Sequence, residues 1–223
     1  MKFIYCFLFL SVLLNSRSSG QTVSGFVPGE INRSDKYLFY LHGGVVTVLG
    51  NNAINQSVPE WGPYEYLNIL DSLKSRGFHV ISENRQQGID DSMYVHKITK
   101  QIDTLFAAGV KPENILVVGA SAGWNIALHV SARLKNKKMN YVVMGGCWPE
   151  TYKDYVGIEI YGHFLSIVES SDPHGTCAAI FENRKLLSSV KEITLHTGMS
   201  HGFFYKGYKH WIDPVTEWAK KKQ

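Results

Sequence analysis

The motif Gly119-Ala120-Ser121-Ala122-Gly123 indicates the fold of this chain more directly than any other segment. It follows the apolar run 115–118 and precedes a segment whose apolar residues recur at helical spacing over 126–130. A serine on a sharp turn between a strand and a helix needs small neighbours, because its backbone is strained and the turn packs closely. The pattern therefore predicts Ser121 as an activated nucleophile at the end of a buried strand. The alternative is a passive serine that begins a Gly/Ala-rich helix.

Short apolar runs alternate with helix-length segments along the rest of the chain. We predict buried strands over 37–41, 78–82, 115–119, 141–145, 163–168 and 192–197. We predict helices over 64–75, 92–109, 122–135, 178–188 and 208–221. In the first of these helices Tyr66, Leu67, Leu70 and Leu73 are expected to form one apolar stripe. The alternation predicts an α/β fold, a three-layer α/β/α sandwich with a mostly parallel sheet.

A second glycine motif, His42-Gly43-Gly44, follows the predicted strand 37–41. Glycine lets the backbone approach a reacting carbonyl closely, so the N–H groups of such a loop can stabilise an oxyanion. We expect the oxyanion donors to be the N–H of Gly43 or Gly44 together with the N–H of Ala122. His42 is expected to orient the loop rather than to act as a base. A simple glycine turn is the alternative.

Together, the 42–44 loop, the Ser121 turn, Asp172 and His201 resemble the α/β-hydrolase superfamily, in chain order and over nearly the whole chain. The resemblance is closest to compact, esterase-like members with no cap domain, because the segment between the predicted strands 141–145 and 163–168 is too short for one. It implies a serine hydrolase that cleaves a carboxylic ester through an acyl-enzyme. Any N-terminal antiparallel strands must be short or missing, because little chain precedes residue 37.

The resemblance also implies the positions of the catalytic base and acid, which follow the nucleophile in the order acid, then histidine. His201 lies just after the predicted strand 192–197 and is the expected base, with His174 as its rival. Asp172 follows the predicted strand 163–168 and is the expected acid, with Glu169 as the runner-up. Glu150 and Asp154 are more distant candidates for the acid.

Substrate contacts are predicted from aromatic residues near these loops. Trp124 follows the Ser121 turn, and Trp61 and Trp148 lie in loops that should border the site. These residues could form an aromatic rim for a small-molecule or polysaccharide-borne ester, and core packing is the alternative for each. Residues 45–63, rich in Gly, Asn and Pro, are expected to form an irregular loop beside the site.

Two cysteines, Cys147 and Cys177, follow the N-terminal segment. In an oxidising compartment such a pair is a candidate disulfide, and two separate buried thiols are the alternative. No His, Cys or Asp cluster has the sequence spacing of metal ligands, so we expect neither a metal nor a cofactor.

Residues 1–20 have the order of a secretory signal peptide. Lys2 precedes the apolar run 3–14, and small residues at 18–20 precede an expected cleavage site at Gln21. The run is shorter than the roughly 20 residues that a membrane-spanning helix needs, which disfavours the alternative of an anchor. We therefore expect a single domain over 21–223, secreted or periplasmic and not attached to a membrane after cleavage.

Residues 1–20 contain Lys2 and Arg17 and no acidic residue, so their removal lowers the formal net charge from +4 to +2, which is too small to favour a nucleic-acid partner. Three other functions remain open at this stage. The chain could be a serine peptidase or an acyltransferase of the same fold, or a non-catalytic binding protein that retains the fold.

Overall fold

A computed structural model of the chain describes residues 21–50 and 61–220. The predicted signal peptide at 1–20 lies outside these residues. Within the described residues, no helix is long and apolar enough to cross a membrane.

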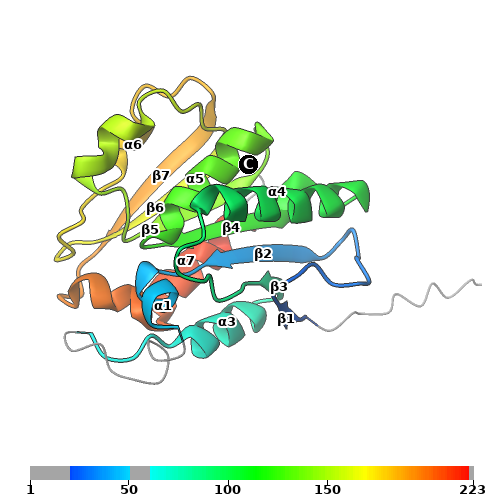
Figure 1. Cartoon of the computed structure of the whole chain (residues 1–223), viewed down its shortest axis with the longest axis horizontal. Coiled ribbons are helices and arrows are strands. Elements are labelled where there is room, and N and C mark those ends of the chain that lie inside the picture. The colour runs from blue at the N-terminus through cyan, green and yellow to red at the C-terminus, as the bar shows by residue number, and fades with distance from the viewer. Residues whose placement is uncertain (1–20, 51–60, 221–223) are drawn as a thin grey trace, which may run out of the picture.

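Seven strands form one sheet in the order β1-β3-β2-β4-β5-β6-β7, and every pair of neighbouring strands is parallel (Figure 1). The strands are β1 (Val23–Ser24), β2 (Lys36–Leu41), β3 (Phe78–Ile81), β4 (Ile115–Ala120), β5 (Asn140–Met144), β6 (Gly162–Glu169) and β7 (Leu187–Leu195). The short β1 pairs in parallel with β3, so the described sheet has no antiparallel strand.

The helices cover both faces of the sheet (Figure 1). They are α1 (Gly44–Leu49), α3 (Tyr66–Lys74), α4 (Asp91–Ala107), α5 (Gly123–Leu134), α6 (Ala178–Phe181) and α7 (Lys209–Trp218), with 3-10 turns η1 (Pro112–Asn114), η2 (Pro149–Tyr155) and η3 (Ser200–Tyr205). Side chains alternate across each strand, so Phe39 of β2 packs with α4 and α5 whereas Leu38 packs with α3 and α7. The predicted three-layer α/β/α sandwich is confirmed.

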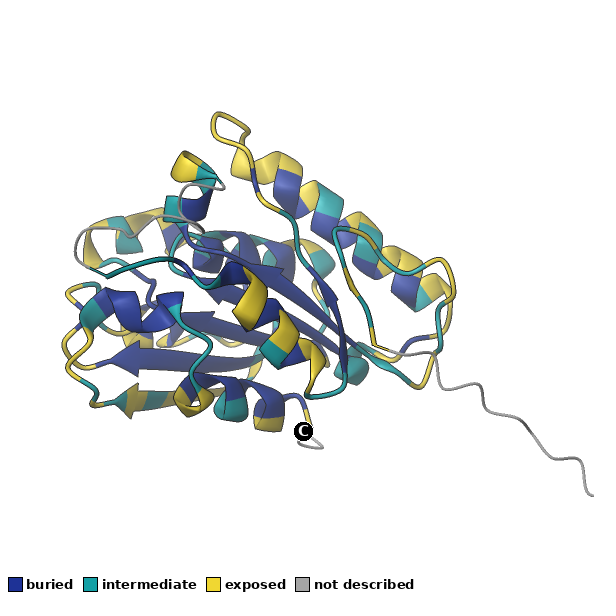
Figure 2. Ribbon diagram, turned by 90° about the horizontal axis from the view of Figure 1, so that it is seen from below, coloured by how far each residue is buried: buried dark blue, intermediate teal, exposed yellow. Residues whose placement is uncertain are grey.

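Burial is concentrated in the inner strands, which lie between the two helix layers (Figure 2). The strands β2, β4 and β5 are buried along almost their whole length, which explains their continuous apolar runs. In a parallel sheet all carboxyl ends lie at one edge. The segments after β2, β4, β5, β6 and β7 therefore meet there, and these segments carry the predicted site residues.

The helix predicted over 178–188 is wrong beyond Phe181, where α6 ends. Glu182 is extended and Asn183 has a positive φ of 59°, which turns the chain out of the helix. The guanidinium of Arg184 then donates hydrogen bonds to the carbonyls of Tyr155 and Ile158. Strand β7 begins at Leu187 and pairs with β6 from Gly162 to Glu169, so long-range pairing overrides the local helical spacing.

Two further expectations need correction. The segment predicted as an irregular loop over 45–63 begins with a helix, since α1 runs from Gly44 to Leu49 and buries Val46; residues 51–60 lie outside the described ones. On α3, Leu67 is 64% exposed and does not belong to the buried stripe. Ile69 takes its place beside Leu70 and Leu73, because positions three and four apart lie on one helix face.

Candidate active site

Ser121 lies on the turn between β4 and α5, with a positive φ of 47°. Its N–H donates to the carbonyl of Met144 on the neighbouring strand at 2.8 Å. Neither of the two glycines that flank this turn can be replaced by a residue with a side chain. A Cβ on Gly119 would lie 2.4 Å from the carbonyl oxygen of Gly123, and one on Gly123 would lie 2.1 Å from that of Leu41. The motif is thus required by backbone contact between β4, α5 and β2.

A continuous line of hydrogen bonds joins three side chains from three different segments. His201 Nε2 lies 2.9 Å from Ser121 Oγ, and His201 Nδ1 lies 2.8 Å from Asp172 Oδ2. Asp172 and His201 are buried, and Ser121 is half-buried. Because Nδ1 faces a carboxylate, it carries the proton, and Nε2 is left to accept from the serine hydroxyl. The structure thus brings together the serine, acid and histidine expected from the sequence.

Glu169, the runner-up for the acid, bonds to other groups, and the carboxylate that contacts His201 is that of Asp172. Its buried carboxylate accepts hydrogen bonds from the N–H and hydroxyl of Ser171 and from the N–H groups of Thr197 and Gly198. Burial opposes ionisation, but these donors outweigh it and lower the pKa of Glu169 from 4.5 to about 2. Glu169 therefore joins the loop that carries Asp172 to the loop that carries His201.

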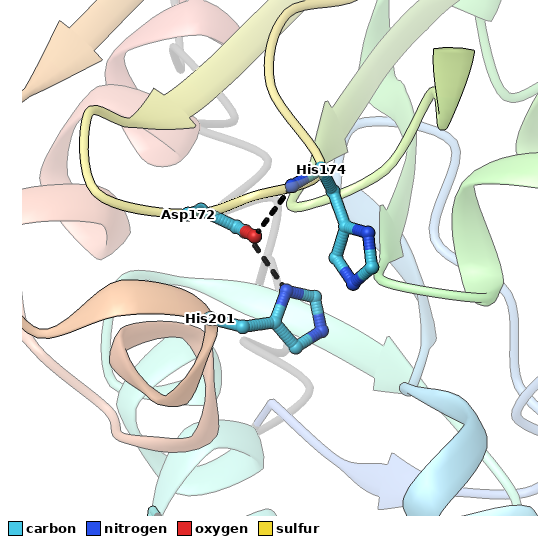
Figure 3. A group of neighbouring side chains, drawn as sticks. All are labelled: Asp172, His174 and His201. Atoms are coloured by element: carbon cyan, nitrogen blue, oxygen red, sulfur yellow. Dashed lines mark hydrogen bonds and ion pairs between the residues drawn. The ribbon is translucent and has the colours of Figure 1, made fainter. Parts of the chain in front are cut away.

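His174, the rival base, also lies at the site but is not the residue that contacts Ser121. Its ring is nearly perpendicular to that of His201, with ring centroids 4.7 Å apart. Its backbone N–H donates to Asp172 Oδ1 at 3.0 Å (Figure 3). Partial burial and the neighbouring His201 lower the pKa of His174. One ligand atom from each of these three residues lies within 4.8 Å of the others, a proximity that sequence spacing could not show.

The glycine loop after β2 lies directly against the serine turn. A Cβ on Gly43 would lie 3.2 Å from the Cβ of Ser121, and one on Gly44 would lie 3.4 Å from the Cβ of Ala122. The N–H of Gly43 already donates to the hydroxyl of Tyr64 at 3.3 Å. Gly44 begins α1 and Ala122 is the N-cap of α5, so neither N–H has an acceptor within its own helix. These two N–H groups remain available to a ligand.

His42 and Arg85 are buried and support this loop through hydrogen bonds. The sequence predicted this role for His42 but not for Arg85. His42 Nδ1 lies 2.9 Å from the carbonyl oxygen of Gly43, and His42 Nε2 accepts from the backbone N–H of Arg85 at 2.9 Å. The Arg85 guanidinium donates to the carbonyl of His42. Burial, followed by the charge of Arg85, lowers the pKa of His42 from 6.5 to about 3. His42 is therefore a neutral residue that holds the loop.

Two of the three predicted tryptophans lie beside the histidines of the site. The Trp61 ring centroid lies 5.4 Å from those of both His201 and Tyr205. The Trp148 ring centroid lies 5.3 Å from that of His174. Both tryptophans are half-buried, so each keeps part of its surface open to solvent.

Trp124 is different, because only 1% of its surface is exposed. It is a core residue and not a pocket wall, which corrects the predicted substrate contact. Its ring lies 4.7 Å from that of Tyr155, and its atoms occupy the space that a side chain on Gly146 would need.

Cys147 and Cys177 form a disulfide in the structure. Cys147 lies in the segment after β5, next to Trp148, and Cys177 is the N-cap of α6. The bond joins two segments that border the site, because Cys177 follows Asp172 and His174 in the same loop.

Comparison with solved structures identifies the fold that holds this site. A protein of unknown function from Agrobacterium tumefaciens, provisionally classed with the α/β-hydrolases, is similar with a TM-score of 0.60 at 15% identity, over 87% of this chain and 88% of the other. An α/β-hydrolase from a sediment metagenome of the Mar Chica lagoon has a TM-score of 0.56 at 13% identity, over 83% and 91%. An inhibited esterase B from Lactobacillus rhamnosis has a TM-score of 0.55 at 13% identity, over 85% and 77%.

No protein-family model matches the chain, and no curated protein matches it in sequence. At sequence identities this low, the similarity to these solved structures concerns the fold alone. The chain has the α/β-hydrolase fold.

Proposed function

We propose that the protein is a serine hydrolase that cleaves carboxylic esters, with Ser121 as the nucleophile, His201 as the base and Asp172 as the acid. The observation that carries this proposal is the line of two hydrogen bonds from Ser121 Oγ through His201 to Asp172, at 2.9 and 2.8 Å. The fold similarity to esterases and other α/β-hydrolases supports the same class of reaction.

The proposed reaction has two steps. His201 Nε2 takes the proton of Ser121 as Oγ attacks the ester carbonyl carbon, and the imidazolium then gives that proton to the leaving alcohol. Water next attacks the acyl-enzyme, His201 takes its proton, and the carboxylic acid leaves as Ser121 recovers its hydrogen. Asp172 holds the imidazole in the required tautomer throughout and stabilises the imidazolium.

We assign the oxyanion donors to the N–H groups of Gly44 and Ala122. Gly44 is favoured over Gly43 because the Gly43 N–H is already donated to Tyr64. Gly44 lies close to Ala122, since a Cβ added to Gly44 would lie 3.4 Å from the Cβ of Ala122, and this proximity supports the assignment. Each donor aimed at an oxyanion contributes roughly 3–4 kcal/mol to transition-state stabilisation.

We further propose that the ester is small or is carried on a polysaccharide. Trp61 and Trp148 flank the two histidines, and aromatic faces of this kind suit sugar rings and aromatic acyl groups. Secretion or export to the periplasm is part of the proposal. The signal-peptide pattern of residues 1–20 supports it, and so does the disulfide, which persists in oxidising compartments.

The test is hydrolysis of p-nitrophenyl acetate by the purified protein and by three variants. Ser121→Ala should abolish turnover. Asp172→Asn should lower kcat by about 10³–10⁴-fold, because the imidazole of His201 is no longer held in the required tautomer. Ser92→Ala, at an exposed serine on α4, is the matched control and should turn over at the wild-type rate. Equal turnover by the wild type and Ser121→Ala would exclude the proposed nucleophile.

A further inference from the structure

His174 is a titratable residue at the site that the proposed reaction does not use. Its ring lies across that of His201 at a centroid distance of 4.7 Å, with the ring planes at 85°. The side chains of Asp172, His174 and His201 each offer one ligand atom, and these atoms lie within 4.8 Å of one another (Figure 3). Imidazole nitrogens are ligands that zinc and similar ions prefer, and a carboxylate is a common partner of a ligating histidine.

We propose that His174 and His201 bind a divalent transition-metal ion such as Zn²⁺, and that this ion reversibly inhibits the protein. One ring nitrogen of each histidine is a ligand, and water fills the remaining positions. The proposal that binding inhibits hydrolysis rests on the proposed function, whereas the binding itself does not.

The state of His174 in the structure favours this role. Among the described residues no hydrogen-bond partner occupies either ring nitrogen, since only its backbone N–H donates, to Asp172. A neutral imidazole therefore presents a free lone pair beside His201. His174 and Ser121 are both half-buried, so part of each residue is accessible to solvent.

Asp172 prepares His201 for the metal without being a direct ligand. Histidines that bind metals almost always donate their second ring N–H to a carboxylate or carbonyl, which fixes the tautomer and raises the basicity of the ligating nitrogen. His201 Nδ1 has such a partner in Asp172 Oδ2 at 2.8 Å. The lone pair of His201 Nε2 thereby points away from Asp172, toward Ser121 Oγ at 2.9 Å, so an ion that binds this nitrogen displaces the serine hydroxyl.

Inhibition follows because one lone pair cannot serve two purposes. In the proposed reaction His201 Nε2 must accept the Ser121 proton, and in the metal complex the same lone pair forms the bond to the ion. Ser121 then keeps its proton and cannot attack. No covalent bond is made or broken, so removal of the ion restores the base.

The first experiment measures binding alone, with Co²⁺ as the probe, because its visible absorption bands report coordination by imidazole. Wild type and Ser121→Ala should both develop these bands, since Ser121 is not a ligand. His174→Leu should lose them, whereas His196→Leu, at an exposed histidine after β7, should keep them. Absence of bands in the folded wild type, or unchanged bands in His174→Leu, would overturn the proposed site.

The second experiment measures inhibition of p-nitrophenyl acetate hydrolysis by Zn²⁺, followed by reversal with EDTA. His174→Leu loses a metal ligand, so its half-inhibitory Zn²⁺ concentration should rise at least about tenfold. Even the loss of a residue that only hydrogen-bonds to a metal ligand lowers metal affinity by about that factor. His196→Leu should be inhibited like the wild type. Equal inhibition of His174→Leu and wild type would contradict the proposal. If no variant turns over the ester, the proposed function fails, and the Co²⁺ spectra decide the metal site independently.

Discussion

The carboxylate of Glu169, at the end of β6, accepts a hydrogen bond from the backbone N–H of Thr197, just after β7, at 2.8 Å. The same carboxylate binds Ser171 on the other side, next to Asp172. Asp172 and His201 lie on separate loops, so their distance depends on what holds those loops together. Glu169 is one link between these loops, and the N–H of Ser200, which donates to the hydroxyl of Ser171, is another.

Glu169→Gln should therefore weaken both stability and activity. An amide places donors where the wild type has only acceptors, so one or more buried N–H groups lose their partner, at a cost of about 2 kcal/mol in unfolding free energy. Turnover of p-nitrophenyl acetate should fall through kcat rather than KM, since the altered distance is that between base and acid. Glu182→Gln, at an exposed position after α6, is the control. Wild-type kcat in Glu169→Gln would show that the loops hold their positions without this carboxylate.

Gly123→Ala should be severely destabilising. The added Cβ would lie 2.1 Å from the carbonyl oxygen of Leu41, a backbone atom that can move only if β2 moves. We expect a loss of more than about 3 kcal/mol in unfolding free energy, measured by chemical denaturation. Gly157→Ala provides the matched control, because a Cβ there meets nothing within 4 Å. Similar denaturation midpoints for the two variants would refute the close contact between α5 and β2.

The lowered pKa of His42 predicts that the free energy of unfolding depends on pH. Its pKa is lowered from 6.5 to about 3 in the folded protein, so between these values the unfolded chain binds a proton that the folded chain does not. Its stabilising contribution is therefore full above pH 6.5 and is lost progressively as the pH falls toward 3. Relative to pH 8, the wild type should lose about 2 kcal/mol at pH 5 from this residue alone.

His42→Asn removes the titrating group and should show a correspondingly smaller loss between the two pH values. Denaturant unfolding of both proteins at pH 8 and pH 5 measures this difference. An identical loss in the two proteins would mean that His42 is protonated in the folded state.

The disulfide between Cys147 and Cys177 should stabilise the fold and the Asp172 loop together. The two residues are 30 positions apart, and closing a loop of that length in the unfolded chain is worth about 3–4 kcal/mol. A Cys147→Ala/Cys177→Ala variant should unfold at a lower temperature than the oxidised wild type. The wild type treated with a reductant should match the variant. An unfolding temperature that does not change with reduction would contradict a structural role for the bond.

Local sequence patterns predicted the elements whose conformation depends on residues close to them in the sequence. The Ser121 turn was predictable because its glycines are required by backbone contacts made immediately around it. The buried strands were predictable because their apolar runs reflect burial on both faces. The order of acid and histidine came from resemblance to a fold family, since neither residue carries a local signature of its own.

The errors occurred where distant contacts override local preference. Residues 187 and 188 were predicted as helix but begin β7, which pairs with β6. Trp124 was predicted to line a pocket but packs against Gly146 in the core. Arg85 was missed because its role depends on reaching the carbonyl of His42 across the fold. The proximity of His174 to His201 is likewise a product of two loops meeting, which spacing along the chain does not encode.

The most direct test of the central claim is covalent labelling of the purified, folded protein with a fluorophosphonate, followed by mass spectrometry of its peptides. An activated serine attacks the phosphorus and expels fluoride, whereas an ordinary serine does not react. The proposed function predicts a single phosphonyl adduct on Ser121, absent from Ser121→Ala and strongly reduced in His201→Ala. A folded wild-type protein that remains unlabelled, or one labelled at another residue, would contradict it.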